Sequence, residues 1–194
     1  MLFRSFLEIG LENAALAHDT GMRKRLLDIS SERFYNDFHF LRVMYYYYLD
    51  NRDASGAAGV LNHLIRQYPD DLEPIYLGLR FSLLTKKKIT YHSFRKLANQ
   101  KGMADQLISL FDVAFDLLNG DKTDALNRIA EFEKKFPHLQ YYATAIRYIA
   151  NDFFSNDEVQ AKKAKKSLLD SVDQYCSEEI KKKGVSPSVG VVPK

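Results

Sequence analysis

The sequence predicts an all-α protein, a stack of antiparallel helix hairpins with about ten helices in all. Apolar residues recur with a helical period along nearly the whole chain, and no stretch reads as a credible strand. Asp53 opens a segment that closes at Tyr68-Pro69, and Asp121 opens another that closes at Phe136-Pro137. The two prolines lie 68 residues apart, which is twice 34. A 34-residue period is typical of stacked hairpins, because each hairpin can bury its apolar face only against its neighbours.

The bulk composition bounds the class of protein. The chain has 194 residues, 46% of them apolar, which is enough to form one hydrophobic core. Its net charge of +3 is too small to indicate binding to nucleic acid. One cysteine excludes an internal disulfide and a four-cysteine zinc site, and favours a reducing, cytoplasmic location. Glu8 and Glu12 interrupt the apolar N-terminal stretch, so we expect no signal peptide there. No apolar run is long enough to span a membrane.

Each expected helix in the first half begins at a side chain that can accept a hydrogen bond from a free backbone N–H. These capping residues are Asp19 or Thr20, Asn36 or Asp37, Asp53, and Asp70 or Asp71. The helices that they open cover 20–34, 37–50, 54–67 and 71–85, after a first helix with one apolar face over 2–16. Pro69 ends the helix 54–67, and Pro74 is tolerated in the first turn of the next helix.

Glycine, proline and aspartate separate the helices of the second half. Helices are expected over 90–100, 103–118, 122–135, 139–154 and from 156–157 to 182. Their boundaries lie at Gly102, Asn119-Gly120, Asp121 and Pro137. The domains that follow are a helical-hairpin repeat domain over 1–155, a lysine-rich capping helix over 156–183 and a flexible tail over 184–194.

Aligning the chain in steps of 34 residues gives columns that test the repeat. One column reads Leu27, Leu61, Arg95 and Ile129, and another reads Arg23, Ala57, Tyr91 and Ala125. Within these columns the residues of two units match well in character, those of a third match in part, and those of the unit from 87 to 103 match poorly. Leu61 is expected to pack between hairpins.

These features resemble the tetratricopeptide repeat family in a degenerate form. The resemblance rests on the small residues Ala57 and Ala125, the closing prolines Pro69 and Pro137, and the large aromatic Tyr48. The family's Leu-Gly pair is absent in register, since Gly10 and Gly78 each fall one position early. The resemblance implies a right-handed superhelix of hairpins with a concave groove that binds another protein.

The resemblance also implies which residues line that groove, because the first helix of each hairpin faces it. In this register they are mostly aromatic, Arg and other polar side chains: His39, Arg42, Tyr46, Glu73, Tyr76, Arg80, Tyr141, Thr144, Tyr148 and Asp152. Aromatic and Arg side chains are enriched at binding hot spots. The alternative is that most of these tyrosines belong to the core with their hydroxyls at the surface. The expected function is a protein-protein interaction module, an adaptor, scaffold or chaperone that holds a partner segment.

Two further surfaces leave alternatives open. The last helix carries a basic patch of Lys162, Lys163, Lys165 and Lys166. Together with Lys86–Lys88 it could bind nucleic acid, although no aromatic residues alternate with the lysines as stacking platforms. The last helix could also meet an acidic partner or a membrane surface, but its lysines are better explained as the solvated outer face of a capping helix, which repeat arrays require for solubility. The run Tyr45–Tyr48 spans a full helical turn, so exposed members could support self-association.

No residue set points to chemistry. The five histidines are scattered without metal-ligand spacing, and Cys176 lies on an apolar stripe. Gly56 and Gly59 fall inside a helix, where they favour close helix approach rather than a phosphate loop. We therefore expect no catalytic residues, no metal and no cofactor, and we expect that the protein is not an enzyme.

Overall fold

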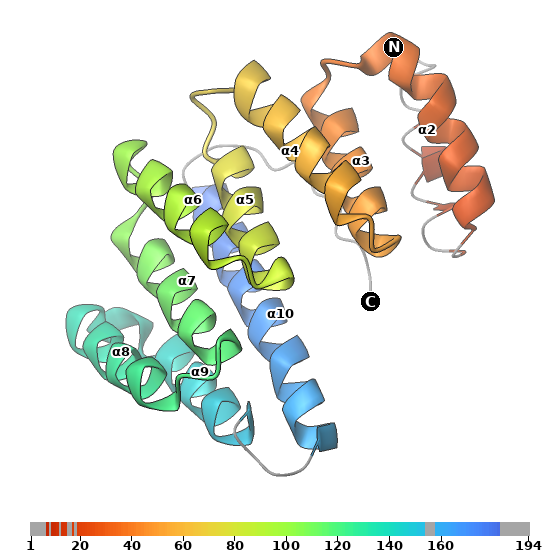
Figure 1. The fold of residues 1–194 in the computed structure, drawn as a ribbon. Helices are drawn as coiled ribbons and strands as arrows, with labels where there is room; N and C mark the ends of the chain where they lie inside the picture. Colours follow the sequence, from red (N-terminus) through yellow and green to blue (C-terminus); the bar gives the residue numbers. More distant parts are fainter. Residues whose placement is uncertain are drawn as a thin grey trace. The chain divides into compact units, whose positions relative to one another are not determined.

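The computed structural model describes residues 7, 9–11, 13–14, 17, 19–153 and 158–182 (Figure 1). Side chains at 31–33, 141, 148, 151–153, 165, 169, 171, 173 and 175–182 lie outside that description. All regular structure in the described residues is helical. The helices are α2 (Thr20–Phe34), α3 (Phe38–Asp50), α4 (Ala54–Gln67), α5 (Glu73–Thr85), α6 (Lys88–Gln100), α7 (Asp105–Leu118), α8 (Lys122–Lys135), α9 (Gln140–Phe153) and α10 (Glu158–Lys182). A single 3₁₀ turn, η1 (Pro137–Leu139), precedes α9.

Most boundaries agree with the sequence, and α4 and α8 coincide with the expected 54–67 and 122–135. Helix α5 starts two residues later than expected, because Leu72 is its N-cap and Asp71 accepts a bond from the Glu73 N–H without extending the helix. The expected tail over 184–194 and the first residues of the helix over 2–16 lie outside the described residues.

The 34-residue period is visible in the backbone itself. The N-cap residues Asp19, Asp53, Lys87 and Asp121 follow one another at this interval, with φ/ψ of −83°/87°, −88°/83°, −88°/96° and −88°/88°. In the three aspartates the carboxylate accepts the N–H three residues on, at 2.8–3.0 Å. The unit from 87 to 103, which the sequence matched poorly, therefore keeps the same geometry at its start.

The chain divides into two compact units, of which unit 1 holds the described residues up to Pro69 and unit 2 holds those from Asp70 onward. In unit 1, α3 and α4 form a hairpin and α2 packs on α3. Its core is built on Leu11, Leu27 and Phe40.

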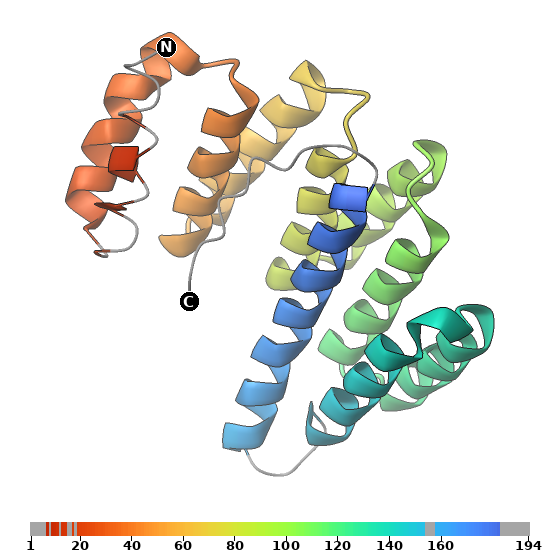
Figure 2. The same ribbon diagram turned by 180° about the vertical axis from the view of Figure 1, so that it is seen from behind.

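Unit 2 contains three hairpins, α5 with α6, α7 with α8, and α9 with α10. Helix α7 is the centre, since it contacts α5, α6, α8 and α10. Ten of its residues are buried, so it has no wide polar face. Helix α10 runs along α9 and α7 (Figures 1 and 2), and buries Ala164, Leu168 and Val172.

The two glycines of α4 make a matched pair for substitution. A Cβ on Gly56 would lie 2.4 Å from Cδ1 of Tyr48 on α3, whereas a Cβ on Gly59 meets nothing within 4 Å. The close approach expected at both glycines is thus confirmed at Gly56 and wrong at Gly59.

We expect Gly59→Ala to stabilise the chain by about 0.5–1 kcal/mol, because alanine is the better helix former. We expect Gly56→Ala to destabilise it by about 1–3 kcal/mol, because the Tyr48 ring must move. Urea unfolding of the two variants measures both effects. Equal shifts of the two midpoints would show that α3 and α4 do not approach closely at Gly56.

Candidate functional site

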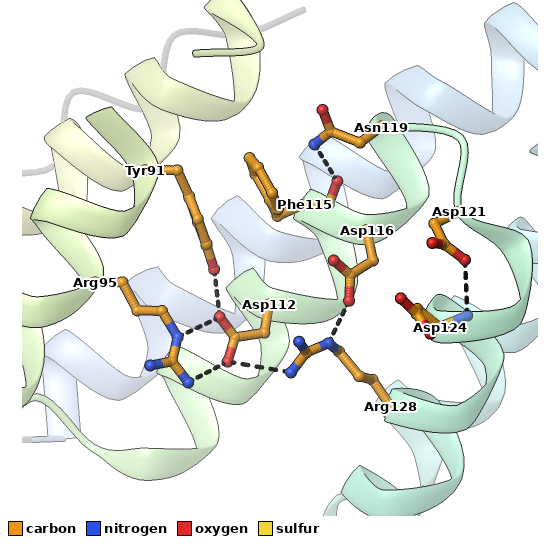
Figure 3. Close-up of polar contacts among 9 residues, drawn as sticks. All are labelled: Tyr91, Arg95, Asp112, Phe115, Asp116, Asn119, Asp121, Asp124 and Arg128. Atoms are coloured by element: carbon orange, nitrogen blue, oxygen red, sulfur yellow. Dashed lines mark hydrogen bonds and ion pairs between the residues drawn. The ribbon is translucent and has the colours of Figure 1, made fainter. Parts of the chain in front are cut away.

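The most connected polar cluster in unit 2 surrounds Asp112 of α7 (Figure 3). Asp112 is 7% exposed. Its Oδ1 accepts bonds from the Tyr91 hydroxyl and from Arg95 Nε, both at 2.7 Å, and its Oδ2 accepts from Arg95 Nη2 at 2.8 Å. From the other side Arg128 of α8 lies 3.8 Å from Oδ2 and also pairs with Asp116. We call these five residues the Asp112 network.

The network shifts several pKa values, in directions that follow from burial and charge. Burial raises the pKa of Tyr91 far above its ordinary value, and the Asp112 carboxylate raises it further. The hydrogen bond to Asp112 raises the pKa of Arg95. Burial raises the pKa of Asp116, although the charge of Arg128 opposes that rise. Burial lowers the pKa of Arg128, but the two carboxylates outweigh it and the net shift is upward.

The charges of the Asp112 network are balanced within it. Two guanidinium groups and two carboxylates cancel in charge, and the Tyr91 hydroxyl keeps its proton because loss would place a third anion beside them. The Tyr91 ring also stacks on Phe115 with centroids 4.0 Å apart. No base or nucleophile is left ready to react, so the network fixes α6 and α8 against α7.

The sequence did carry a signal for this network, which the initial interpretation missed. Tyr91 and Arg95 are the residues that break the small and apolar columns of the 34-residue alignment. Arg23 breaks the same small-residue column, and it too pairs with a carboxylate on the next helix, Asp50 at 2.8 Å. A polar residue in an apolar column indicates a compensating charge nearby.

In unit 1 a second arrangement lies around the turn between α2 and α3. The Tyr35 ring, 61% exposed, packs on His63 of α4 with centroids 4.5 Å apart. Phe38 meets the edge of Tyr68 at 5.0 Å. Asn36 contacts one residue of each ring pair. Its backbone carbonyl accepts a hydrogen bond from the Tyr68 hydroxyl, and its Oδ1 lies 3.1 Å from His63 Nε2. We call Tyr35, Asn36, Phe38, His63 and Tyr68 the turn surface.

A small pocket opens on neighbouring residues of the same turn. It is lined by apolar side chains with three polar ones, namely Leu7, Leu11, Ser30, Phe34, Asp37, His39, Phe40 and Val43. The Ser30 hydroxyl donates to the Leu26 carbonyl, and Asp37 accepts from the Phe40 N–H. A volume of about 20 Å³ holds a water molecule or the tip of one apolar side chain. The pocket is therefore far too small for an ordinary small-molecule ligand.

Large apolar side chains are also exposed on α2 of the same unit. Met22 is 48% exposed and Ile29 is 53% exposed. They lie seven residues apart, so they share one side of the helix. Single exposed apolar residues are common on folded proteins, so these two by themselves do not indicate a binding surface.

The residues predicted to line a groove are distributed over both units. In unit 1, His39 and Tyr46 are half-buried, and buried Arg42 lies 3.3 Å from His39 through Nη2 and Nδ1. In unit 2, Tyr76 is buried against Phe111, Glu73 and Arg80 are half-buried, and Thr144 is exposed.

The side chains of three other predicted residues, Tyr141, Tyr148 and Asp152, lie outside the described set. Burial of Tyr76 agrees with the alternative that assigned such tyrosines to the core.

The other expectations concern charge, metals and membranes. Lys162, Lys163 and Lys166 are exposed on α10, while the side chains of Lys165 and Cys176 are outside the description. Among the described residues no three His, Cys, Asp or Glu side chains are grouped so that they could hold a metal ion. Within the same residues, no helix has the length and apolar character needed to cross a bilayer.

Comparison with models of protein families, with characterised proteins and with solved structures finds no match to this chain. Its function has to be inferred from the chemistry of its own surfaces.

Proposed function

We propose that the protein is a non-enzymatic interaction module that binds an apolar segment of another protein at the turn surface of unit 1. The observation that carries this proposal is the exposed Tyr35 ring, held on His63, in the same turn whose residues Phe34 and Asp37 line a pocket that fits one apolar side chain. The partner segment would lay an aromatic or aliphatic residue on Tyr35 and place a second in the pocket. His39, one of the residues that the sequence assigned to partner binding, lines that pocket.

Rigidity supports the proposal, because a preformed surface loses little entropy when it binds. The Asp37 carboxylate caps α3 at 3.0 Å from the Phe40 N–H, and the Tyr68 hydroxyl is anchored on the Asn36 carbonyl. The two ends of the turn are thus fixed. Aromatic rings held in this way offer large contact area together with a polar edge, as interface hot spots do.

The hairpin architecture gives general support. Helix starts at 34-residue intervals, with matching backbone angles, are what an array of the tetratricopeptide type would have. The right-handed superhelix, the adaptor or chaperone role and the cytoplasmic location belong to this proposal. Self-association through Tyr45–Tyr48 is a lesser possibility within it, since Tyr45 is fully buried.

A selection of short random peptides displayed on phage tests the proposal. We expect the intact chain to enrich peptides with two apolar anchors, and Tyr35→Ser to weaken their binding at least about tenfold, as loss of a hot-spot residue does. Fluorescence anisotropy with one selected peptide measures the change. Tyr35 is exposed, so the variant should fold normally.

Ile89→Ser is the matched control, because Ile89 is a large apolar residue of unit 2 that is even more exposed than Tyr35. It should leave peptide affinity within about twofold, a free-energy change too small to matter at a hot spot. If the selected peptides bind intact chain and Tyr35→Ser alike, or if nothing is enriched, the turn surface is not a binding site.

A further inference from the structure

The turn between α5 and α6 in unit 2 combines positive charge with exposed aliphatic side chains. Lys86, Lys87 and Lys88 follow one another and all three are exposed. On either side of them, Leu84 is 37% exposed and Ile89 is 84% exposed. None of the three amino groups has an ion-pair partner within the described part of the chain. We call Leu84 and Lys86–Ile89 the lysine turn.

Folding does not explain the lysines. At the equivalent point of three other hairpins an aspartate caps the following helix, whereas Lys87 has the same backbone angles and no capping side chain. Lys87 and Lys88 also place positive charge at the N-terminus of α6, where the helix dipole disfavours cations. Lys86 adopts a left-handed conformation, φ 53°, but so do the equivalent residues of the neighbouring units, Arg52 at φ 58° and Gly120 at φ 82°, so this conformation belongs to the repeated turn. What distinguishes this turn is the missing aspartate cap and the exposed positive charge, and these two local costs indicate selection by something outside the fold.

We propose that the lysine turn docks the protein on an anionic lipid bilayer. The lysines would neutralise lipid headgroups, each contributing electrostatic attraction close to the surface. Ile89 and Leu84 would enter the boundary between headgroups and acyl chains, where aliphatic side chains gain from burial. The backbone of the turn is closed by bonds from the Lys86 N–H to the Leu83 carbonyl and from the Lys87 N–H to the Ser82 carbonyl. The backbone that carries the apolar and basic residues is thus ordered before binding.

The aliphatic pair favours lipid over nucleic acid as the anionic partner. Binding to single strands relies on aromatic side chains that stack on bases, and Tyr91, the nearest tyrosine, is buried under Phe115. An acidic protein surface would be matched by the lysines alone and would leave Ile89 unused. A bilayer uses both features, since reversible attachment generally needs a basic patch together with an apolar anchor.

Co-sedimentation with vesicles tests this inference, using phosphatidylcholine alone and phosphatidylcholine mixed with phosphatidylserine. The intact chain is expected to bind only the mixed vesicles, and less so as salt is raised. Lys86→Gln/Lys87→Gln/Lys88→Gln should lower the partition coefficient about a hundredfold, and Ile89→Ser about tenfold. Lys162→Gln/Lys163→Gln/Lys166→Gln removes the same charge from exposed sites of α10 and should change it by no more than about threefold.

Each alternative outcome overturns the inference. If both triple variants lose binding equally, attachment is diffuse attraction to a basic protein. If Ile89→Ser binds as well as the intact chain, nothing enters the bilayer, and an acidic protein becomes the better partner. If no vesicle binds but polyuridylate does, and the Lys86–Lys88 variant abolishes that binding, the turn recognises nucleic acid. Tyr35→Ser should leave vesicle binding unchanged, which keeps this test separate from that of the turn surface.

Discussion

Asp112→Ala is expected to lower the free energy of unfolding by about 2–4 kcal/mol. The substitution removes the acceptor of three hydrogen bonds and leaves the Tyr91 hydroxyl buried without a partner. Arg95 and Arg128 are partly exposed and can turn toward water, so the cost falls short of that for a fully buried ion pair. Chemical denaturation followed by circular dichroism measures the change.

The control for this prediction is Asp70→Ala. Asp70 pairs with Lys101 at 3.0 Å, but its side chain is 94% exposed, and exposed pairs contribute less than about 1 kcal/mol. A second variant, Tyr91→Phe/Arg95→Leu/Asp112→Leu, replaces the polar side chains of this contact by apolar ones. Leucine already occupies the position equivalent to Arg95 in the unit that contains Leu61. The triple variant should recover most of the stability. Equal effects of Asp112→Ala and Asp70→Ala would show that the Asp112 network does not hold α6, α7 and α8 together.

Leu61→Ala is expected to cost about 2–5 kcal/mol. Leu61 is 2% exposed and belongs to the face of α4 that also buries Ala57, Val60 and Leu64. Removing its side chain leaves a cavity between α4 and α3, which pack as a hairpin. Thermal and urea unfolding report the loss.

Leu84→Ala makes the same chemical change at a partly exposed site of α5 and should cost less than about 1 kcal/mol. If Leu61→Ala falls in that range too, the apolar column of the 34-residue alignment does not mark the positions between helices.

Local features of the fold were accessible from the sequence because they depend on neighbouring residues. A capped helix start requires only one carboxylate three residues before the N–H that it accepts, and Asp53 and Asp121 satisfy that in the sequence itself. Proline at 69 and 137 fixes helix ends for equally local reasons. The 34-residue period then follows from the spacing of these capping aspartates and prolines along the sequence.

Contacts between residues that are distant in the sequence could not be predicted in this way. Tyr35 and His63 meet only after α2, α3 and α4 have packed, and Arg95 and Asp112 meet only after α6 has packed on α7. Tyr76 was assigned to a groove by register alone, and the packing of Phe111 on it decides that it is buried. In the sequence Lys87 is simply one of three consecutive lysines. Its equivalence to three aspartate caps depends on backbone angles, which belong to the folded chain.

The proposed role as a binding module is tested most directly by amide chemical shifts in ¹⁵N-labelled protein titrated with a selected peptide. The account predicts that the largest changes fall at the turn surface and at the pocket residues His39 and Val43, while amides of the lysine turn stay in place. Changes centred on α10 or on the lysine turn, or changes scattered evenly over both units, would contradict it.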